Sequence, residues 1–170
     1  MTRFDVVALG YHYPTETSAR ELSVAIAQID GEVARHMRRF VEAVEVLSLG
    51  EWEELHTATL DLSAPFVPYV GHVAWGENYR RGAFMADLQA AMRSEGIDLH
   101  GELPDHIEPI LRYLSVTSDP LPDLMDVLPD AVAEMKHTLN RAAGKNPYRH
   151  LLAATMECAG NRPVSIGGRR

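Results

Sequence analysis

The chain has 170 residues, of which 46% are hydrophobic, and a formal net charge of −8 at pH 7. This length and apolar content suit the core of one domain, and the negative charge argues against nucleic acid as a partner. No stretch approaches the roughly 20 apolar residues that span a bilayer, so stable membrane insertion is not expected.

Hydrophobic periodicity predicts helices along most of the chain. The first apolar run, Asp5 to Leu9, is too short for its pattern to distinguish a strand from a helical turn. The segments 33–47 and 123–139 have apolar side chains at spacings of three and four, with charged residues on the opposite face, which is typical of amphipathic helices. Weaker patterns predict further helices over 17–29, 51–60, 66–75, 79–94, 104–116 and 147–159.

These patterns predict an all-α fold, namely a single-domain helical bundle over residues 1–160. Asn78 is the expected N-cap of the helix over 79–94, and Gly96 is expected to end it. The segment 161–170, which is rich in glycine and arginine, is expected to be a flexible C-terminal tail.

Cysteine and histidine usage argues against disulfides and metal. Cys158 is the only cysteine, which excludes an internal disulfide and predicts a small buried side chain on a late helix. No two of the eight histidines have the i, i+4 spacing that would face one ion from a helix, so no metal site is expected. The segment 142–146 lacks the first glycine and the Ser/Thr of a phosphate loop, and we expect no cofactor. With an N-terminus unlike an export signal, these features predict a cytoplasmic protein.

The segment 102–106, Glu-Leu-Pro-Asp-His, combines an acid and a histidine that could belong to a catalytic triad. If Pro104 opens the next helix, Asp105 and His106 lie about 100° apart around its axis, and the carboxylate cannot readily orient the imidazole. Proline at the first helical position and aspartate in the first turn favour a helix start. His106 is then expected to be neutral, and able to grip a peptide backbone.

The centre of the chain resembles the NarJ family, which includes the TorD and DmsD chaperones of molybdenum-containing oxidoreductases. Glu102-Leu103-Pro104-Asp105-His106 is the most specific element of this resemblance. The other matches are individually weaker and count by their order: Asp61-Leu62-Ser63, Tyr69, Gly76-Glu77, Arg81-Gly82, Phe84-Met85, Leu88, Leu111 and Leu114, with Tyr13-Pro14, Asn146-Pro147-Tyr148 and Leu151-Leu152 outside the centre.

Two departures from the family's pattern bear on the client protein. These chaperones commonly place a proline directly after Asp-His and one apolar residue, whereas here Glu108 precedes Pro109. The segment 76–79 stands where the nitrate reductase chaperones typically carry a histidine-glycine pair. They suggest a client of the exported type, resembling dimethylsulfide, ethylbenzene, chlorate or selenate oxidoreductases, more than nitrate reductase itself.

The resemblance implies a chaperone without catalytic activity. Its expected partner is the N-terminal leader of an immature molybdopterin-containing oxidoreductase catalytic subunit, held while the cofactor is inserted. Such leaders are basic at one end and apolar beyond, so we expect aromatic side chains to contact the apolar part and acids to meet arginines. The expected peptide-binding residues are Tyr69, His72, Trp75, Tyr79, Glu102, Asp105 and His106.

Two alternatives from other functional classes remain open from the sequence. A hydrolase would place Asp105 and His106 in one cleft with a nucleophile, although no Gly-x-Ser-x-Gly element is present. A helical regulatory or scaffold protein would lack a peptide groove. A contiguous exposed apolar patch lined by the expected residues would count against it.

Overall fold

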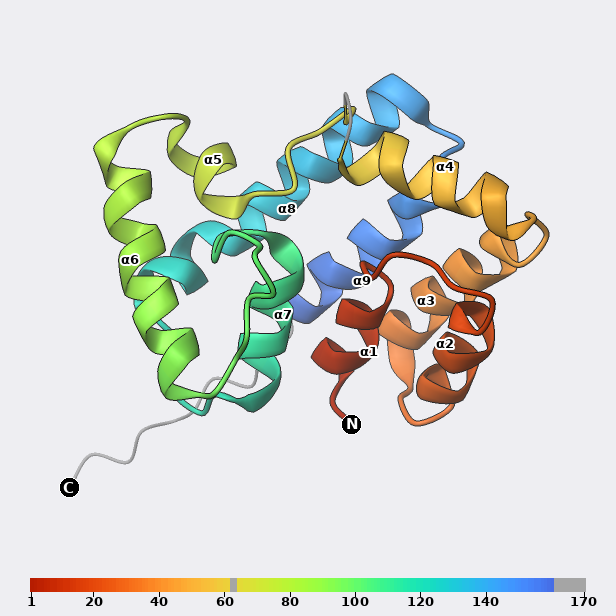
Figure 1. Cartoon of the computed structure of the whole chain (residues 1–170), viewed down its shortest axis with the longest axis horizontal. Helices are drawn as coiled ribbons and strands as arrows, with labels where there is room; N and C mark the ends of the chain where they lie inside the picture. The colour runs from red at the N-terminus through yellow and green to blue at the C-terminus, as the bar shows by residue number, and fades with distance from the viewer. Residues whose placement is uncertain (62–63, 161–170) are drawn as a thin grey trace.

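The computed structural model describes residues 1–61 and 64–160, and within them every regular element is a helix (Figure 1). The predicted all-α, single-domain fold is confirmed. The predicted tail, 161–170, lies outside the described residues. The helices are α1 (Arg3–Leu9), α2 (Ser18–Ile26), α3 (Gly31–Val44), α4 (Leu49–Leu60), α5 (Val70–Trp75), α6 (Tyr79–Ser94), α7 (Ile107–Val116), α8 (Pro122–Ala143) and α9 (Tyr148–Gly160).

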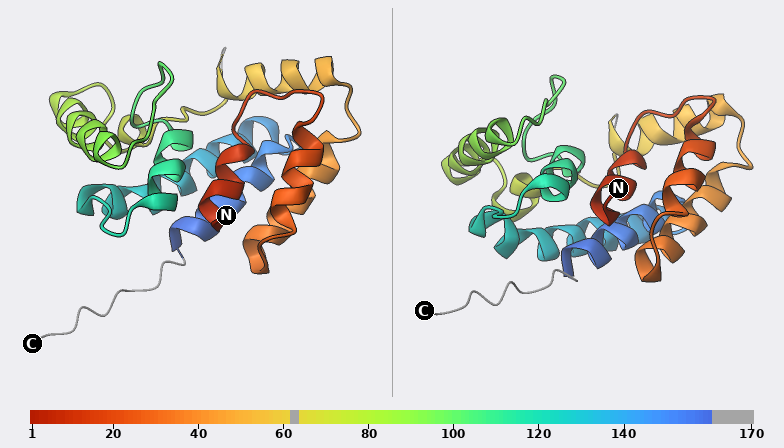
Figure 2. Two further views of the ribbon diagram at one scale, coloured as in Figure 1. Left: turned by 60° about the horizontal axis from the view of Figure 1, so that its bottom comes forward. Right: turned by 90° about the horizontal axis from the view of Figure 1, so that it is seen from below.

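The helices form two groups joined by α8 and α9. In Figure 1, α5 and α6 lie at one end of the molecule and α2, α3 and α4 at the other. The long helix α8 runs between these ends in all three ribbon views (Figures 1 and 2). It packs against α5 at one end and α9 at the other, α9 packs against α3, and α1 packs against α7. The elements that carry the candidate site, α5 to α7, are therefore supported by α8 and α1.

Side-chain caps explain where several helices begin and end. Thr2 and Asp5 form a reciprocal capping box, which explains why the ambiguous run at residues 5–9 folds as helix α1. The Asn78 side chain accepts a hydrogen bond from the Arg80 N–H at 2.8 Å, as expected of the N-cap of α6. Gly96 follows α6 at φ +71°, a left-handed conformation that glycine adopts without a steric penalty, so both predicted boundaries are confirmed.

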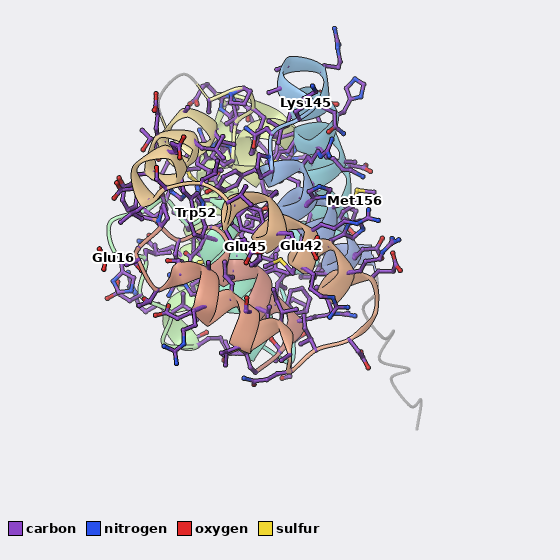
Figure 3. All side chains as sticks on the ribbon, turned by 90° about the vertical axis from the view of Figure 1, so that its right-hand side faces the viewer. Glu16, Glu42, Glu45, Trp52, Lys145 and Met156 are labelled. Carbon is purple, nitrogen blue, oxygen red and sulfur yellow. The ribbon has the colours of Figure 1, made fainter. Side chains whose placement is uncertain are left out.

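An aromatic cluster closes the core at the end formed by α3, α4 and α9, where Trp52 is labelled in Figure 3. The Phe40 and Tyr148 rings meet edge to face at 5.1 Å. The Tyr148 hydroxyl accepts a hydrogen bond from Trp52 Nε1 at 3.3 Å and lies 2.9 Å from His56 Nδ1. Cys158 is buried as predicted, and burial raises the pKa of its thiol to about 12.

Two predicted helices begin later than their sequence patterns indicated. The Val70 N–H donates to the Asp105 carbonyl at 2.8 Å, and the Ile107 N–H donates to the Pro68 carbonyl at 3.0 Å. These bonds form an antiparallel bridge between Tyr69 and His106. Because bridged residues are extended, α5 begins at Val70 rather than at 66, and α7 at Ile107 rather than at 104. The prediction that Pro104 opens a helix, with Asp105 in its first turn, is wrong.

Candidate functional site

The bridge between residues 68–70 and 105–107 brings the first pair of candidate residues together. The rings of Tyr69 and His106 meet edge to face, with their centres 5.2 Å apart. The Tyr69 hydroxyl donates to Glu102 Oε1 at 3.0 Å. Partial burial, together with the neighbouring carboxylate of Glu102, raises the pKa of Tyr69 to about 12. Three of the expected binding residues therefore form one contact group, and both Tyr69 and Glu102 stay partly exposed.

Asp105 lies beneath this group, paired with an arginine. Arg81 Nε donates to Asp105 Oδ2 at 2.8 Å, and Nη2 lies 3.4 Å from Oδ1. The Asp105 side chain is 0% exposed and that of Arg81 is 9% exposed. Hydrogen bonding to Asp105 raises the pKa of Arg81. The expectation that Asp105 meets an arginine of the leader needs correction, because its carboxylate is enclosed and already bound within the protein.

The ion pair continues outward to the surface through α6 and α5. Arg81 Nη1 donates to Glu77 Oε1 at 2.7 Å, and His72 Nδ1 lies 2.9 Å from the same oxygen. The Glu77 side chain is 77% exposed. The series His72, Glu77, Arg81 and Asp105 thus connects α5, α6 and the strand-like segment before α7. Glu77 is the solvent-exposed carboxylate of this series.

The last two expected residues lie at the junction of α5 and α6. Trp75 packs edge to face on Phe84, with ring centres 5.0 Å apart, and the Arg80 guanidinium lies 5.3 Å from the Trp75 ring centre. Tyr79 is 90% exposed and forms no ring contact within the described ranges. The structure therefore brings Tyr69, His72, Glu102, Asp105 and His106 together, places Trp75 nearby, and leaves Tyr79 apart.

Sequence reasoning missed two residues that shape the site. Arg81 was noted only as part of the resemblance, although it is the partner of Asp105. Gly71 lies against that pair: a Cβ at this position would lie 2.8 Å from Asp105 Oδ2 and 3.1 Å from Phe84 Cδ1. A glycine early in an apolar segment was the available signal, since glycine often marks a close approach.

His106 and Asp105 do not form an acid–imidazole pair. His106 is the N-cap of α7, and its Nδ1 accepts a hydrogen bond from the Glu108 N–H at 3.2 Å. This bond requires an unprotonated Nδ1, so the neutral ring carries its proton on Nε2. Burial lowers the pKa of His106, which agrees with the expected neutral form. The geometry that a hydrolase would need from these two residues is therefore absent.

The lowered pKa of His106 predicts a pH-dependent stability. An unfolded histidine titrates near 6.5, and the folded side chain titrates lower, so acid favours the unfolded chain between these two values. His56, also shifted down by burial, adds to the effect. We expect His106→Asn, which can accept the same N–H without titrating, to lose less stability than wild type between about pH 7.5 and about pH 5.5. Thermal melts of wild type and variant across this pH range test the prediction. Superimposable plots of melting temperature against pH would show that His106 does not contribute to the pH dependence of stability.

Residues 1–61 and 64–160 contain neither a metal-binding cluster nor a helix that could cross a membrane. No group of three or more His, Cys, Asp or Glu side chains there is arranged to hold a metal ion. None of the described helices is both long and apolar enough to cross a membrane. In comparisons with known proteins, no family model and no curated protein matches the chain.

Proposed function

We propose that this chain is a cytoplasmic assembly chaperone of the NarJ and TorD type. In this proposal it holds the N-terminal leader of an immature molybdopterin-containing oxidoreductase catalytic subunit while the cofactor is inserted, before export or membrane docking. It acts by binding its client and carries out no reaction of its own. The basis is the sequence resemblance together with the arrangement of the residues that carry it.

One observation carries the proposal. Residues of the resemblance from two separate segments, 69–81 and 102–106, converge on one network of contacts. The network has a buried part, in which Arg81 and Asp105 pair, and an accessible part, in which Tyr69 and Glu102 are partly exposed. A fixed scaffold beneath accessible aromatic and acidic groups suits peptide binding, because a pre-organised surface loses little entropy when the ligand arrives.

The accessible groups complement a basic and apolar leader. The Tyr69 ring supplies contact area with few rotatable bonds, and the carboxylates of Glu102 and Glu77 can each accept charge-assisted hydrogen bonds from arginine. The net charge of −8 adds a long-range attraction for a basic segment. The same groups offer no activated nucleophile, which favours binding over turnover.

A peptide titration tests the proposal. The labelled N-terminal segments of the molybdopterin oxidoreductase catalytic subunits of the source organism are titrated with the wild-type protein, and saturable binding of one of them is expected. Glu102→Gln keeps an acceptor for the Tyr69 hydroxyl but removes the charge, so affinity should fall roughly tenfold to a hundredfold. Fluorescence anisotropy measures the dissociation constants of wild type and Glu102→Gln.

Glu95→Gln provides the matched control, because Glu95 is an exposed acid beyond the end of α6 and outside the contact group. Its affinity should equal that of wild type. The absence of binding to the wild-type protein would refute the proposed function. Binding that is equally tight in wild type and Glu102→Gln would leave the function standing and remove Glu102 from the site.

A further inference from the structure

This acidic chain has a basic face, which lies outside α5 to α7, the helices of the candidate site. The segment 31–44 forms α3, and the segment 136–150 forms the end of α8 and the start of α9. Together they contain seven of the 16 lysines and arginines of the chain, but only two of its 24 aspartates and glutamates. Because α9 packs against both α3 and α8, the two segments lie beside each other (Figure 2). Cations therefore gather here, against the charge of the rest of the protein.

Three helices build the centre of this basic face. Its side chains are His36 and Arg39 of α3, Lys136 of α8, and Arg149 and His150 of α9. His36 and Arg39 lie three positions apart, so they project from one side of α3. Arg149 Nη1 donates to the Gly144 carbonyl at 2.5 Å, and its Nε donates to His150 Nε2 at 3.3 Å. The packing of α3, α8 and α9 therefore holds these groups together.

The two histidines respond to the cations around them. Burial and the charges of Arg149 and Arg39 lower the pKa of His150. Burial and neighbouring cations, Lys136 among them, lower the pKa of His36. Charges from all three helices therefore act within one small region of the surface.

Arg39 and Lys136 are not neutralised by direct contact within the described part of the chain. Neither side chain forms a hydrogen bond or an ion pair there. The buried Nδ1 of His36 also has no hydrogen-bond partner among these residues. The nearest acids, whose charges oppose the pKa shifts of the two histidines, are Glu32, Glu42 and Glu157. Because like charges that are brought together repel, an anion bound between the three helices would relieve that repulsion.

We propose that the basic face binds a short acidic segment of a partner protein, at a site separate from the one proposed for the leader. The carboxylates of this segment lie over Arg39 and Lys136, and the planar guanidinium of Arg39 matches the geometry of a carboxylate. A membrane surface or a long nucleic acid would also bring negative charge up to the surrounding acids, which repel it, whereas a short segment would not. The two sites thus take segments of opposite charge.

The double variant Arg39→Gln/Lys136→Gln tests this site. The probe is a labelled synthetic peptide of about twelve residues, half of them glutamate. Wild type should bind it saturably, and the variant should bind it at least roughly tenfold more weakly. Added salt should weaken binding less in the variant than in wild type, because fewer charges meet the peptide. A peptide with glutamine in place of every glutamate should bind neither protein.

Arg20→Gln/Arg93→Gln is the matched control, because it removes the same charge at exposed positions of α2 and α6, outside the basic face. Its affinity for the acidic peptide should stay within about twofold of wild type. Equal binding by wild type and Arg39→Gln/Lys136→Gln, or no binding by wild type, would overturn the proposal. Tighter binding of wild type to phosphatidylglycerol vesicles, or to single-stranded RNA of equal charge, would overturn the choice of an acidic protein segment.

Thermal melts separate lost binding from misfolding. Arg39→Gln/Lys136→Gln should melt at or above the temperature of wild type at low salt, because the substitutions remove like charges that repel. The difference should shrink as salt is added. A variant that melts well below wild type at low salt would show that the two cations already have partners within the fold, and would contradict the proposed site.

Discussion

Asp105→Ala is expected to lower the free energy of unfolding by about 3–5 kcal/mol, the largest effect that the site predicts for one substitution. Asp105 is fully enclosed, and its carboxylate binds the nearly enclosed guanidinium of Arg81 at 2.8 Å. Removing the carboxylate leaves a buried cation whose remaining partner is the exposed Glu77. Chemical denaturation of wild type and variant measures the difference.

A double-mutant cycle separates this pairing from general loss of packing. Arg81→Ala alone should also be strongly destabilising, and the double variant Arg81→Ala/Asp105→Ala should lose less stability than the sum of the two single losses. Asp87→Ala, at an exposed position of α6, should change stability by no more than about 0.5 kcal/mol. A loss below about 1 kcal/mol for Asp105→Ala, the size expected of a simple helix-start residue, would contradict the buried pairing.

Gly71→Ala and Gly82→Ala are expected to change stability in opposite directions. A Cβ at Gly71 would meet Asp105 Oδ2 at 2.8 Å, Phe84 Cδ1 at 3.1 Å and Arg81 Cγ at 3.2 Å, so α5 must move and the protein should lose about 1–3 kcal/mol. A Cβ at Gly82 meets no atom within 4 Å, so alanine there should gain close to 1 kcal/mol of helix propensity.

The contrast between these two glycines is informative because both lie in helices of the same region, α5 and α6. Helix propensity alone predicts that both alanine variants are more stable than wild type. Denaturant titrations of wild type and the two variants measure the change in the free energy of unfolding, provided that their m-values agree. A stabilised Gly71→Ala protein would show that α5 does not approach the ion pair as closely as described.

Local sequence patterns predicted the helices well because helix formation depends on neighbouring residues. The helix expected over 79–94 has those bounds in α6, since Asn78 caps its start and Gly96 adopts the left-handed conformation after its end. The starts of α5 and α7 were missed because the bridge between residues 68–70 and 105–107 joins segments more than thirty positions apart. Periodicity contains no information about such pairing.

The candidate site was predicted only in part, because its contacts also depend on segments that are far apart in the sequence. The resemblance identified residues that converge in space, among them Tyr69, Glu102 and His106, but it did not distinguish which side chains are accessible. Asp105 was expected to face the client, and it lies instead inside the protein against Arg81. The partner of a buried charge depends on tertiary packing, so neither the acid–histidine spacing nor helix-start preferences could identify it.

Co-purification with a full-length client most directly tests whether this chain binds a molybdenum enzyme through its leader. The catalytic subunit whose leader binds this chain is expressed together with it, once intact and once without its N-terminal segment. The molar masses of the affinity-purified complexes are measured by size-exclusion chromatography with light scattering. A complex is expected with the intact subunit and none with the truncated one. Equal recovery of both subunits, or recovery of neither, would contradict this expectation.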